Sequence, residues 1–273
     1  MTNSPIGLLD SGVGGLTVVK AVTDRLPNES IIYIGDSERC PYGDRSKEEI
    51  INYTLELVQF LLDQHVKMIV IACNTATAHT LEIVRNKVDI PVIGVVEPGS
   101  EAAIRLTNSK EVGVLATVST VDSGFYEKSI LAQDGSIHVK SIACPEFVDI
   151  VEKNAYESVE AKKIVDKSLE SFKTENMDTV ILGCTHFPLL MPFIQEKLGK
   201  EVALIDSGSL TSYEVEKVLK EFKLEAEAYN TKTIDIFTTG PEKTFRTVAQ
   251  DWLQTDQLNI QTVSLERLES TND

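Results

Sequence analysis

Two segments of this chain repeat one order of residue types, and this repeat constrains the fold more than any other feature. The first, Met68–His79, reads MIVIACNTATAH, and the second, Val180–Pro188, reads VILGCTHFP. In each, an apolar run typical of a buried parallel strand is followed by a cysteine, Cys73 or Cys184, and then by polar residues that favour a helix start. Because unpaired backbone N–H groups surround a helix N-terminus, we expect the pKa of Cys73 to be lowered. Two cysteines in matching frames indicate a functional pair.

Strand and helix patterns alternate along the whole chain, which is typical of α/β proteins with parallel sheets. We predict strands near residues 6–9, 30–35, 69–71, 92–96, 112–116, 137–142, 179–182, 202–205, 233–237 and 260–265. We predict helices near residues 16–26, 47–64, 74–87, 121–132, 144–152, 159–172, 189–198, 209–222 and 242–252. Ser46 and Glu49 form a capping box at the start of the second helix.

The chain also divides into two similar halves. Each half has a hydroxyl residue at the end of its first strand, Ser11 or Thr117, and later a cysteine at the end of another strand. Breaks in the pattern at 97–100 and 206–208 predict a first lobe of residues 1–97 plus 208–273 and a second of 98–207. Ligands bind at the carboxyl ends of parallel strands. We therefore expect two pseudo-symmetric parallel-sheet α/β domains that face each other across a central cleft, with one cysteine on each wall.

Charge and motif content exclude several classes of function. The formal net charge of −16 argues against nucleic acid or an anionic membrane surface as a partner. No apolar run approaches the about 20 residues that span a bilayer, and the first residues do not resemble a signal peptide, so we expect a cytoplasmic protein. The four cysteines include no C-x-x-C pair, so neither a metal site nor a disulfide framework is expected. The turn Gly12–Gly15 matches neither nucleotide-binding fingerprint.

Two facing thiols suit inversion of a carbon stereocentre. One thiolate removes a proton from one face of the carbon, and the other thiol returns a proton to the opposite face. Asp10 ends the first strand, His186 lies two residues after Cys184, and Glu152 is carried by a nearby helix. Carboxylates and imidazoles beside thiols adjust the pKa values that such an exchange needs.

Each of these residues also has a structural interpretation. A lone cysteine at a strand end is more often a small buried residue than a catalyst. His186 alone could be a hydrogen-bonding residue at a helix start, and Glu152 alone a solvated helix residue. Cys40 and Cys144 lack the strand–cysteine–helix frame and are interpreted as structural. We assign no role to the other three histidines, His65, His79 and His138.

Four segments in order along the chain resemble the cofactor-independent aspartate/glutamate racemase family. They are GLLDSGVGG at 7–15, RCPYG at 39–43, CNTAT at 73–77 and GCTH at 183–186. The resemblance extends from about residue 6 to beyond residue 240. It implies two facing α/β domains, interconversion of L- and D-glutamate for peptidoglycan synthesis without a cofactor, and a homodimer. Phe187 stands where many relatives have tyrosine, which affects its contacts more than the chemistry.

Carried over by position, the resemblance implies that Cys73 and Cys184 form the acid–base pair, assisted by Asp10, Glu152 and His186. It also implies substrate contacts from Asp10, Ser11, Tyr42, Gly43, Asn74, Thr75, Thr117, Thr120 and Thr185. Arg39 is the one basic residue of the motifs, so carboxylates would be held by hydroxyls, amides and helix N-termini. Such a site suits an anionic amino acid.

Other functions stay open at this stage. Aspartate racemase or another amino-acid racemase of the same superfamily would use the same residue chemistry, so the choice of glutamate rests on the resemblance. A two-lobed binding protein without catalysis would bind its ligand but would not exchange its α-proton. A redox pair of thiols would form a disulfide between Cys73 and Cys184.

Overall fold

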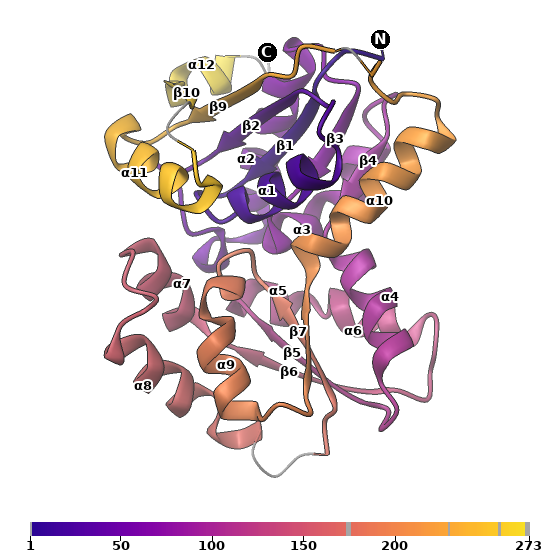
Figure 1. Cartoon of the computed structure of the whole chain (residues 1–273), viewed down its shortest axis with the longest axis vertical. Coiled ribbons are helices and arrows are strands. Elements are labelled where there is room, and N and C mark those ends of the chain that lie inside the picture. Colours follow the sequence, from indigo (N-terminus) through magenta and orange to yellow (C-terminus); the bar gives the residue numbers. More distant parts are fainter. Residues whose placement is uncertain (1, 173–175, 229, 256–257, 271–273) are drawn as a thin grey trace.

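Two parallel sheets organise the chain, one in each of two lobes that lie one above the other in Figure 1. The computed structural model describes residues 2–172, 176–228, 230–255 and 258–270. The upper sheet has strand order β10-β9-β2-β1-β3-β4, and the lower sheet has order β6-β5-β7-β8. All strand pairs are parallel. The predicted fold class, two parallel-sheet α/β domains, is confirmed.

The strand bounds follow the prediction closely. The upper sheet contains β1 (Ile6–Asp10), β2 (Ile31–Gly35), β3 (Met68–Ile71), β4 (Val92–Gly94), β9 (Ile234–Thr238) and β10 (Asn259–Thr262). The lower sheet contains β5 (Glu111–Ala116), β6 (His138–Ala143), β7 (Thr179–Gly183) and β8 (Ala203–Asp206).

Helices cover both faces of each sheet (Figure 1). In the upper lobe they are α1 (Leu16–Arg25), α2 (Lys47–Asp63), α3 (Asn74–Arg85), α10 (Ser207–Glu221), α11 (Glu242–Leu253) and α12 (Leu265–Glu269). In the lower lobe they are α4 (Val96–Leu106), α5 (Val118–Ser123), α6 (Phe125–Leu131), α7 (Pro145–Glu152), α8 (Val159–Ser168) and α9 (Met191–Leu198). Three short 3₁₀ turns complete the described elements: η1 (Tyr42–Asp44), η2 (Glu170–Phe172) and η3 (Phe187–Leu190).

Alternation along the buried strands explains why the upper sheet is covered on both sides. Leu8 and Tyr33 belong to a cluster of buried side chains with residues of α1 and α11, whereas Leu9 and Ile34 belong to another with residues of α2, α3 and α12. Successive side chains of a strand point to opposite faces, so both clusters need an apolar strand residue at every position. The predicted capping box at Ser46 is present and starts α2.

Both sheets use the same strand order around their first strand. β2 and β3 lie on opposite sides of β1, as β6 and β7 lie on opposite sides of β5. Connections that leave a strand in opposite directions open a crevice at the carboxyl ends, where ligands bind. Ser11 and Cys73 follow β1 and β3, and Thr117 and Cys184 follow β5 and β7. The repeat in the sequence therefore corresponds to equivalent positions in two like-ordered sheets.

Three details of the predicted secondary structure were wrong. The predicted break at 97–100 lies inside α4, because Pro98 falls in the first helical turn, where its missing N–H is not needed. The helix predicted at 121–132 is divided into α5 and α6 at Gly124, whose φ is +62°. The last predicted strand ends at Thr262, and Ser264 instead caps α12. The domain boundaries at 97/98 and 207/208 stay a proposal.

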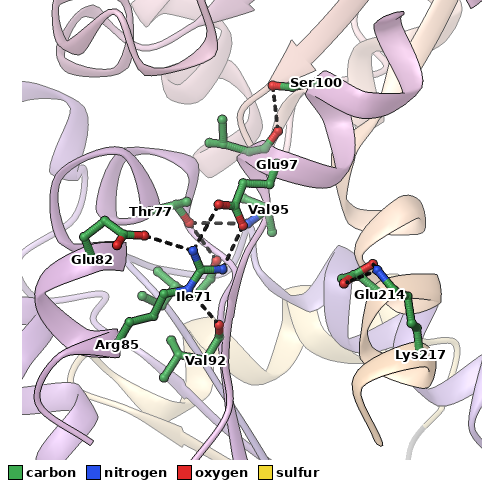
Figure 2. Close-up of polar contacts among 11 residues, drawn as sticks. Ile71, Thr77, Glu82, Arg85, Val92, Val95, Glu97, Ser100, Glu214 and Lys217 are labelled. Atoms are coloured by element: carbon green, nitrogen blue, oxygen red, sulfur yellow. Dashed lines mark hydrogen bonds and ion pairs between the residues drawn. The ribbon is translucent and has the colours of Figure 1, made fainter. Parts of the chain in front are cut away.

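The connection from β4 to α4 is tied to α3 by a cluster of polar contacts that Figure 2 shows. Arg85 forms two bonds with Glu97, of 3.0 Å from Nη1 and 2.8 Å from Nη2, and its Nε donates to the Val92 carbonyl at 3.2 Å. Thr77 donates to the Ile71 carbonyl and accepts from the Val95 N–H. These contacts join the end of the upper sheet to the first helix of the lower lobe.

Replacing Glu97 by glutamine should lower the free energy of unfolding by about 1 kcal/mol, because it breaks a bidentate but partly exposed ion pair. The Arg85 and Glu97 side chains are 34% and 40% exposed, so water screens much of the interaction. Urea unfolding measures the change. Glu101→Gln is the matched control, since its partner Arg105 is 78% exposed, and that variant should be unchanged. If both substitutions lower the free energy of unfolding equally, the Arg85–Glu97 pair has no special role in stability.

No helix in the described part of the chain is both long and apolar enough to cross a membrane.

Candidate active site

A small cavity lies between the lobes, where the carboxyl ends of the two sheets meet. It is lined by Ser11, Pro41, Tyr42, Gly43, Cys73, Asn74, Thr75, Thr117, Val148, Cys184, Thr185 and His186. Both cysteines line it, and each side chain is nearly inaccessible to solvent. Because Cys73 follows β3 and Cys184 follows β7, the two sulfurs enter the cavity from different lobes.

Cys73 lies between a parallel strand and a helix, as the sequence predicts, and it is itself the N-cap of α3, whereas Asn74 and Thr75 lie inside the helix. Its Sγ accepts the Ala76 N–H at 3.4 Å and lies 3.8 Å from Ser11 Oγ. The expected low pKa is wrong, however. Burial, reinforced by the negative charge of Asp10, raises the pKa of Cys73 to about 12, against the smaller lowering effect of the Ala76 N–H. Cys73 is therefore a protonated thiol at neutral pH.

Cys184 is in contact with an imidazole and, through it, a carboxylate. Its Sγ lies 3.5 Å from His186 Nδ1, and His186 Nε2 lies 2.5 Å from Glu152 Oε1. Burial opposes charging of the imidazole, but the bonds to Cys184 and Glu152 outweigh it and raise the pKa of His186 well above 6.5. Burial likewise opposes ionisation of Glu152, but His186 outweighs it and lowers the pKa of that carboxyl. The His186–Glu152 dyad thus favours an imidazolium next to the Cys184 sulfur.

Asp10 lies behind the cavity wall rather than on it. Its carboxylate is fully buried, accepts the Gly12 N–H at 3.0 Å and faces the Thr185 hydroxyl at 3.5 Å. Burial raises the pKa of Asp10 above its usual value, while the His186 charge and backbone donors act in the opposite direction. The carboxylate of one lobe therefore contacts the segment that carries Cys184 in the other.

Hydroxyl and amide groups join the lobes on the other side of the cavity. Thr75 Oγ1, from the first turn of α3, lies 2.9 Å from Thr117 Oγ1 and 3.1 Å from Thr120 Oγ1. Asn74 accepts a hydrogen bond from Tyr126 at 2.7 Å. Polar groups of this kind bind carboxylates through charge-assisted hydrogen bonds without a basic side chain.

The loop after β2 brings Tyr42 and Gly43 to the cavity. The Tyr42 hydroxyl donates to Asp36 Oδ2 at 2.6 Å, so it is directed away from a ligand. Asp36 also accepts from Arg39 at 2.7 Å, which anchors the loop. A Cβ on Gly43 would lie 2.8 Å from Thr117 Cβ, so glycine is needed for the lobes to approach this closely.

The structure brings together most of the predicted residues. Ten of them line the cavity: Ser11, Tyr42, Gly43, Cys73, Asn74, Thr75, Thr117, Cys184, Thr185 and His186. Asp10, Glu152 and Thr120 lie one hydrogen bond behind it. The sequence reasoning missed Pro41 and Val148, which also line the cavity, and Tyr126. Pro41 lies within the RCPYG segment, so that motif could have indicated it, whereas nothing local marks the other two.

Cys40, interpreted above as structural, contacts a residue of the predicted site. Its thiol donates to Glu152 Oε1 at 3.7 Å, so it contacts the carboxylate that also binds His186. Burial, with the negative charge of Glu152, raises the pKa of the Cys40 thiol and keeps it protonated. Among the described residues, no cluster of three His, Cys, Asp or Glu side chains is placed to hold a metal ion.

This arrangement can exchange protons with both sides of one small molecule. One wall carries a protonated thiol, and the other carries a sulfur in contact with an imidazole that favours its charged form. General acid–base catalysis requires groups within hydrogen-bond reach of the reacting atom, and a cavity this small keeps both sulfurs close to its contents.

Comparison with known proteins agrees with this geometry. The chain is 49% identical over 267 residues to a glutamate racemase of Carnobacterium sp. (strain St2), covering 97% of this chain and 100% of the relative. Its fold matches glutamate racemase RacE1 of Bacillus anthracis with a TM-score of 0.94 at 42% identity, covering 97% and 99%. It matches Francisella tularensis glutamate racemase in complex with D-glutamate with a TM-score of 0.91 at 36% identity, covering 98% and 100%. Because the Asp/Glu/Hydantoin racemase family model also matches residues 16–212, the chain belongs to the Asp/Glu/Hydantoin racemase family.

Proposed function

We propose that this protein is a glutamate racemase that interconverts L- and D-glutamate by two-base proton transfer between Cys73 and Cys184. One observation carries the mechanism: equivalent strand ends of two like-ordered sheets contribute these two thiols to one buried cavity. The choice of glutamate is supported by relatives that carry that activity in their names over nearly their full length.

In the direction from L- to D-glutamate, the Cys184 thiolate removes the α-proton, and the electron pair of the C–H bond stays on the substrate as a carbanion. The Cys73 thiol then donates its proton to the opposite face of the α-carbon. The product is D-glutamate, with Cys184 now a thiol and Cys73 a thiolate. The reverse direction exchanges these roles, so no redox change or further reactant is needed.

The surroundings of the two sulfurs fit this starting state. Burial keeps Cys73 protonated, as its first role as an acid requires. The His186–Glu152 dyad places an imidazole that favours its charged form beside the Cys184 sulfur, where the proposed base carries a negative charge. Asp10 helps through its contact with Thr185 and its charge near Cys73.

The substrate carboxylates are bound by neutral groups in this proposal. Asn74 and Thr75 lie in the first turn of α3, whose free N–H groups and dipole favour an anion. The remaining contacts come from Ser11, the Tyr42–Gly43 backbone, Thr117, Thr120 and Thr185. With these donors on several sides, the α-amino acid is held with its α-carbon between the two sulfurs.

In the cell, the enzyme would supply D-glutamate for peptidoglycan synthesis. We propose a cytoplasmic homodimer that acts on the free amino acid and has no nucleic-acid or membrane partner. The acidic net charge of −16 supports the exclusion of nucleic acid. Size-exclusion chromatography with light scattering tests the dimer.

When purified protein is added to L-glutamate without any cofactor, the circular dichroism signal of the amino acid should disappear as the racemate forms. The purified protein should have no visible absorption band and should keep its activity after treatment with carbonyl reagents, because no lysine among the described residues lines the cavity to form a Schiff base. Activity that depends on added pyridoxal phosphate would contradict the proposal. Racemisation of aspartate instead would assign the protein to the aspartate branch of the family.

Binding of glutamate without exchange of its α-proton in heavy water would indicate a binding protein. A disulfide between Cys73 and Cys184 under mild oxidation, with no racemisation, would indicate a redox pair.

A further inference from the structure

Asn74 has an unequal set of hydrogen-bond partners in the cavity. Its side-chain oxygen accepts from the Tyr126 hydroxyl at 2.7 Å and from the Ser207 hydroxyl at 3.5 Å. Its side-chain nitrogen is buried and, within the described residues, has no hydrogen-bond partner. A buried amide N–H₂ without a partner is costly, so an acceptor on a bound ligand would satisfy this nitrogen.

The two hydroxyls reach Asn74 from outside its own helix. Tyr126 is on α6 of the lower lobe, and Ser207 is the first residue of α10, where the chain leaves the lower sheet. In Figure 1, α10 runs from this point up along the upper lobe. The orientation of the Asn74 amide is therefore set in part by Tyr126, a residue of the other lobe that reaches it only when the lobes are together.

The Tyr126 ring is held firmly in place. It is buried, and a Cβ on Gly183 would lie 2.9 Å from Tyr126 Cε2, so glycine allows the ring to lie against the end of β7 beside Cys184. Burial raises the pKa of Tyr126 above its usual value, although the Ser207 hydroxyl lowers it somewhat. The phenol therefore keeps its proton and acts as a donor, which requires an acceptor opposite it.

We propose that Tyr126 and Ser207 are positioning residues for Asn74: their hydroxyls hold its amide oxygen, so that its amide nitrogen faces the cavity and donates to a carboxylate oxygen of the bound amino acid. This inference rests on the proposed function, because it takes the ligand to be an amino acid with a carboxylate. A flipped amide would place an oxygen against that carboxylate and repel it. Lobe closure and substrate recognition are thereby coupled through one side chain.

Tyr126→Phe removes the hydroxyl and keeps the ring, so it should raise KM for both enantiomers about tenfold with a smaller change in kcat. Ser207→Ala should have a weaker effect in the same direction, because its contact is longer. Tyr156→Phe is the matched control: its hydroxyl donates to Asp251 at 2.9 Å on the surface, and KM should not change.

A double-mutant cycle separates positioning from a structural role. In an Asn74→Ala background, Tyr126→Phe should change KM by less than about twofold, because the amide to be oriented is gone. If Tyr126→Phe raises KM by the same factor in the wild-type and Asn74→Ala backgrounds, or leaves KM unchanged, the proposal is overturned. Thermal unfolding of all four proteins checks that they fold.

Calorimetric binding of D-glutamate to the same four proteins keeps this test distinct from the proposed function. Coupled binding with no racemisation by the unaltered protein would refute the function and leave the positioning role standing. Racemisation by the unaltered protein, with no coupling between Tyr126 and Asn74 in binding, would support the function and refute the positioning role. Absence of both binding and racemisation would overturn both.

Discussion

Replacing Cys184 by serine should abolish proton abstraction from L-glutamate while leaving abstraction from D-glutamate, and Cys73→Ser should do the reverse. A serine hydroxyl is hardly ionised at neutral pH, so it cannot replace a thiolate base, and the loss should be on the order of 10³-fold or more. Each sulfur comes from a different lobe, so each is expected to reach only one face of the α-carbon. Both variants should lose overall racemisation.

The measurement must follow the first proton transfer alone. Because the two enantiomers have equal free energy in solution, kcat/KM for racemisation has to fall equally in both directions in any variant. Elimination from a glutamate analogue with a leaving group on the β-carbon needs only the first base, since the α-proton goes to that base as the leaving group departs. Exchange of the α-proton in heavy water gives a second readout.

Cys144→Ser is the matched control for these substitutions. Its thiol contacts the Ile142 carbonyl at 3.9 Å outside the cavity lining, so turnover should be retained. Identical behaviour of Cys73→Ser and Cys184→Ser toward the two isomers would refute the two-face assignment. Full racemisation by either would refute the two-thiol mechanism itself.

His186→Asn should lower turnover by about 10²–10⁴-fold, the usual size of general acid–base assistance, while the fold survives. The reason is the contact of 3.5 Å between His186 Nδ1 and Cys184 Sγ, which supplies positive charge to the proposed base. Glu152→Gln should have a smaller effect of the same kind, because it acts through His186. His79→Asn is the control, since its Nε2 contacts Ser119 at 2.9 Å outside the cavity.

The contribution of the His186–Glu152 dyad to the stability of the protein should also depend on pH in a defined way. The pKa of His186 is raised by folding, so its contribution is fully present below its ordinary value of 6.5 and is lost as pH rises through the raised value. The pKa of Glu152 is lowered, so its contribution is present above 4.5 and is lost as pH falls through the lowered value.

The free energies of unfolding of the wild type and of His186→Asn, measured with urea, should therefore differ most between pH 4.5 and 6.5. A constant difference from pH 4 to 9 would show that the pair is not ionised in the folded protein. Unchanged turnover in both His186→Asn and Glu152→Gln would return these residues to a structural interpretation.

The sequence by itself determined the architecture and the two thiols. Each buried strand of the parallel sheets is a short apolar run, and each cysteine follows such a run directly, so local residue order is enough to place it at a sheet edge. The likeness of the two halves was also predictable, because each repeats a hydroxyl after its first strand and a cysteine after its third, whereas the strand order of the sheets came from the structure. The capping box at Ser46 is likewise a local signal.

Only the tertiary structure decided how the cavity is arranged electrostatically. The helix start at Cys73 predicts a low pKa, but burial and Asp10 reverse it, and burial depends on contacts between segments far apart in the chain. The contacts of Cys40 with Glu152 and of Tyr126 with Asn74 also join residues that no periodicity relates. Local residue order specifies strands and helix starts because these depend on neighbours in the chain, whereas desolvation and side-chain pairing depend on which parts of the two lobes meet.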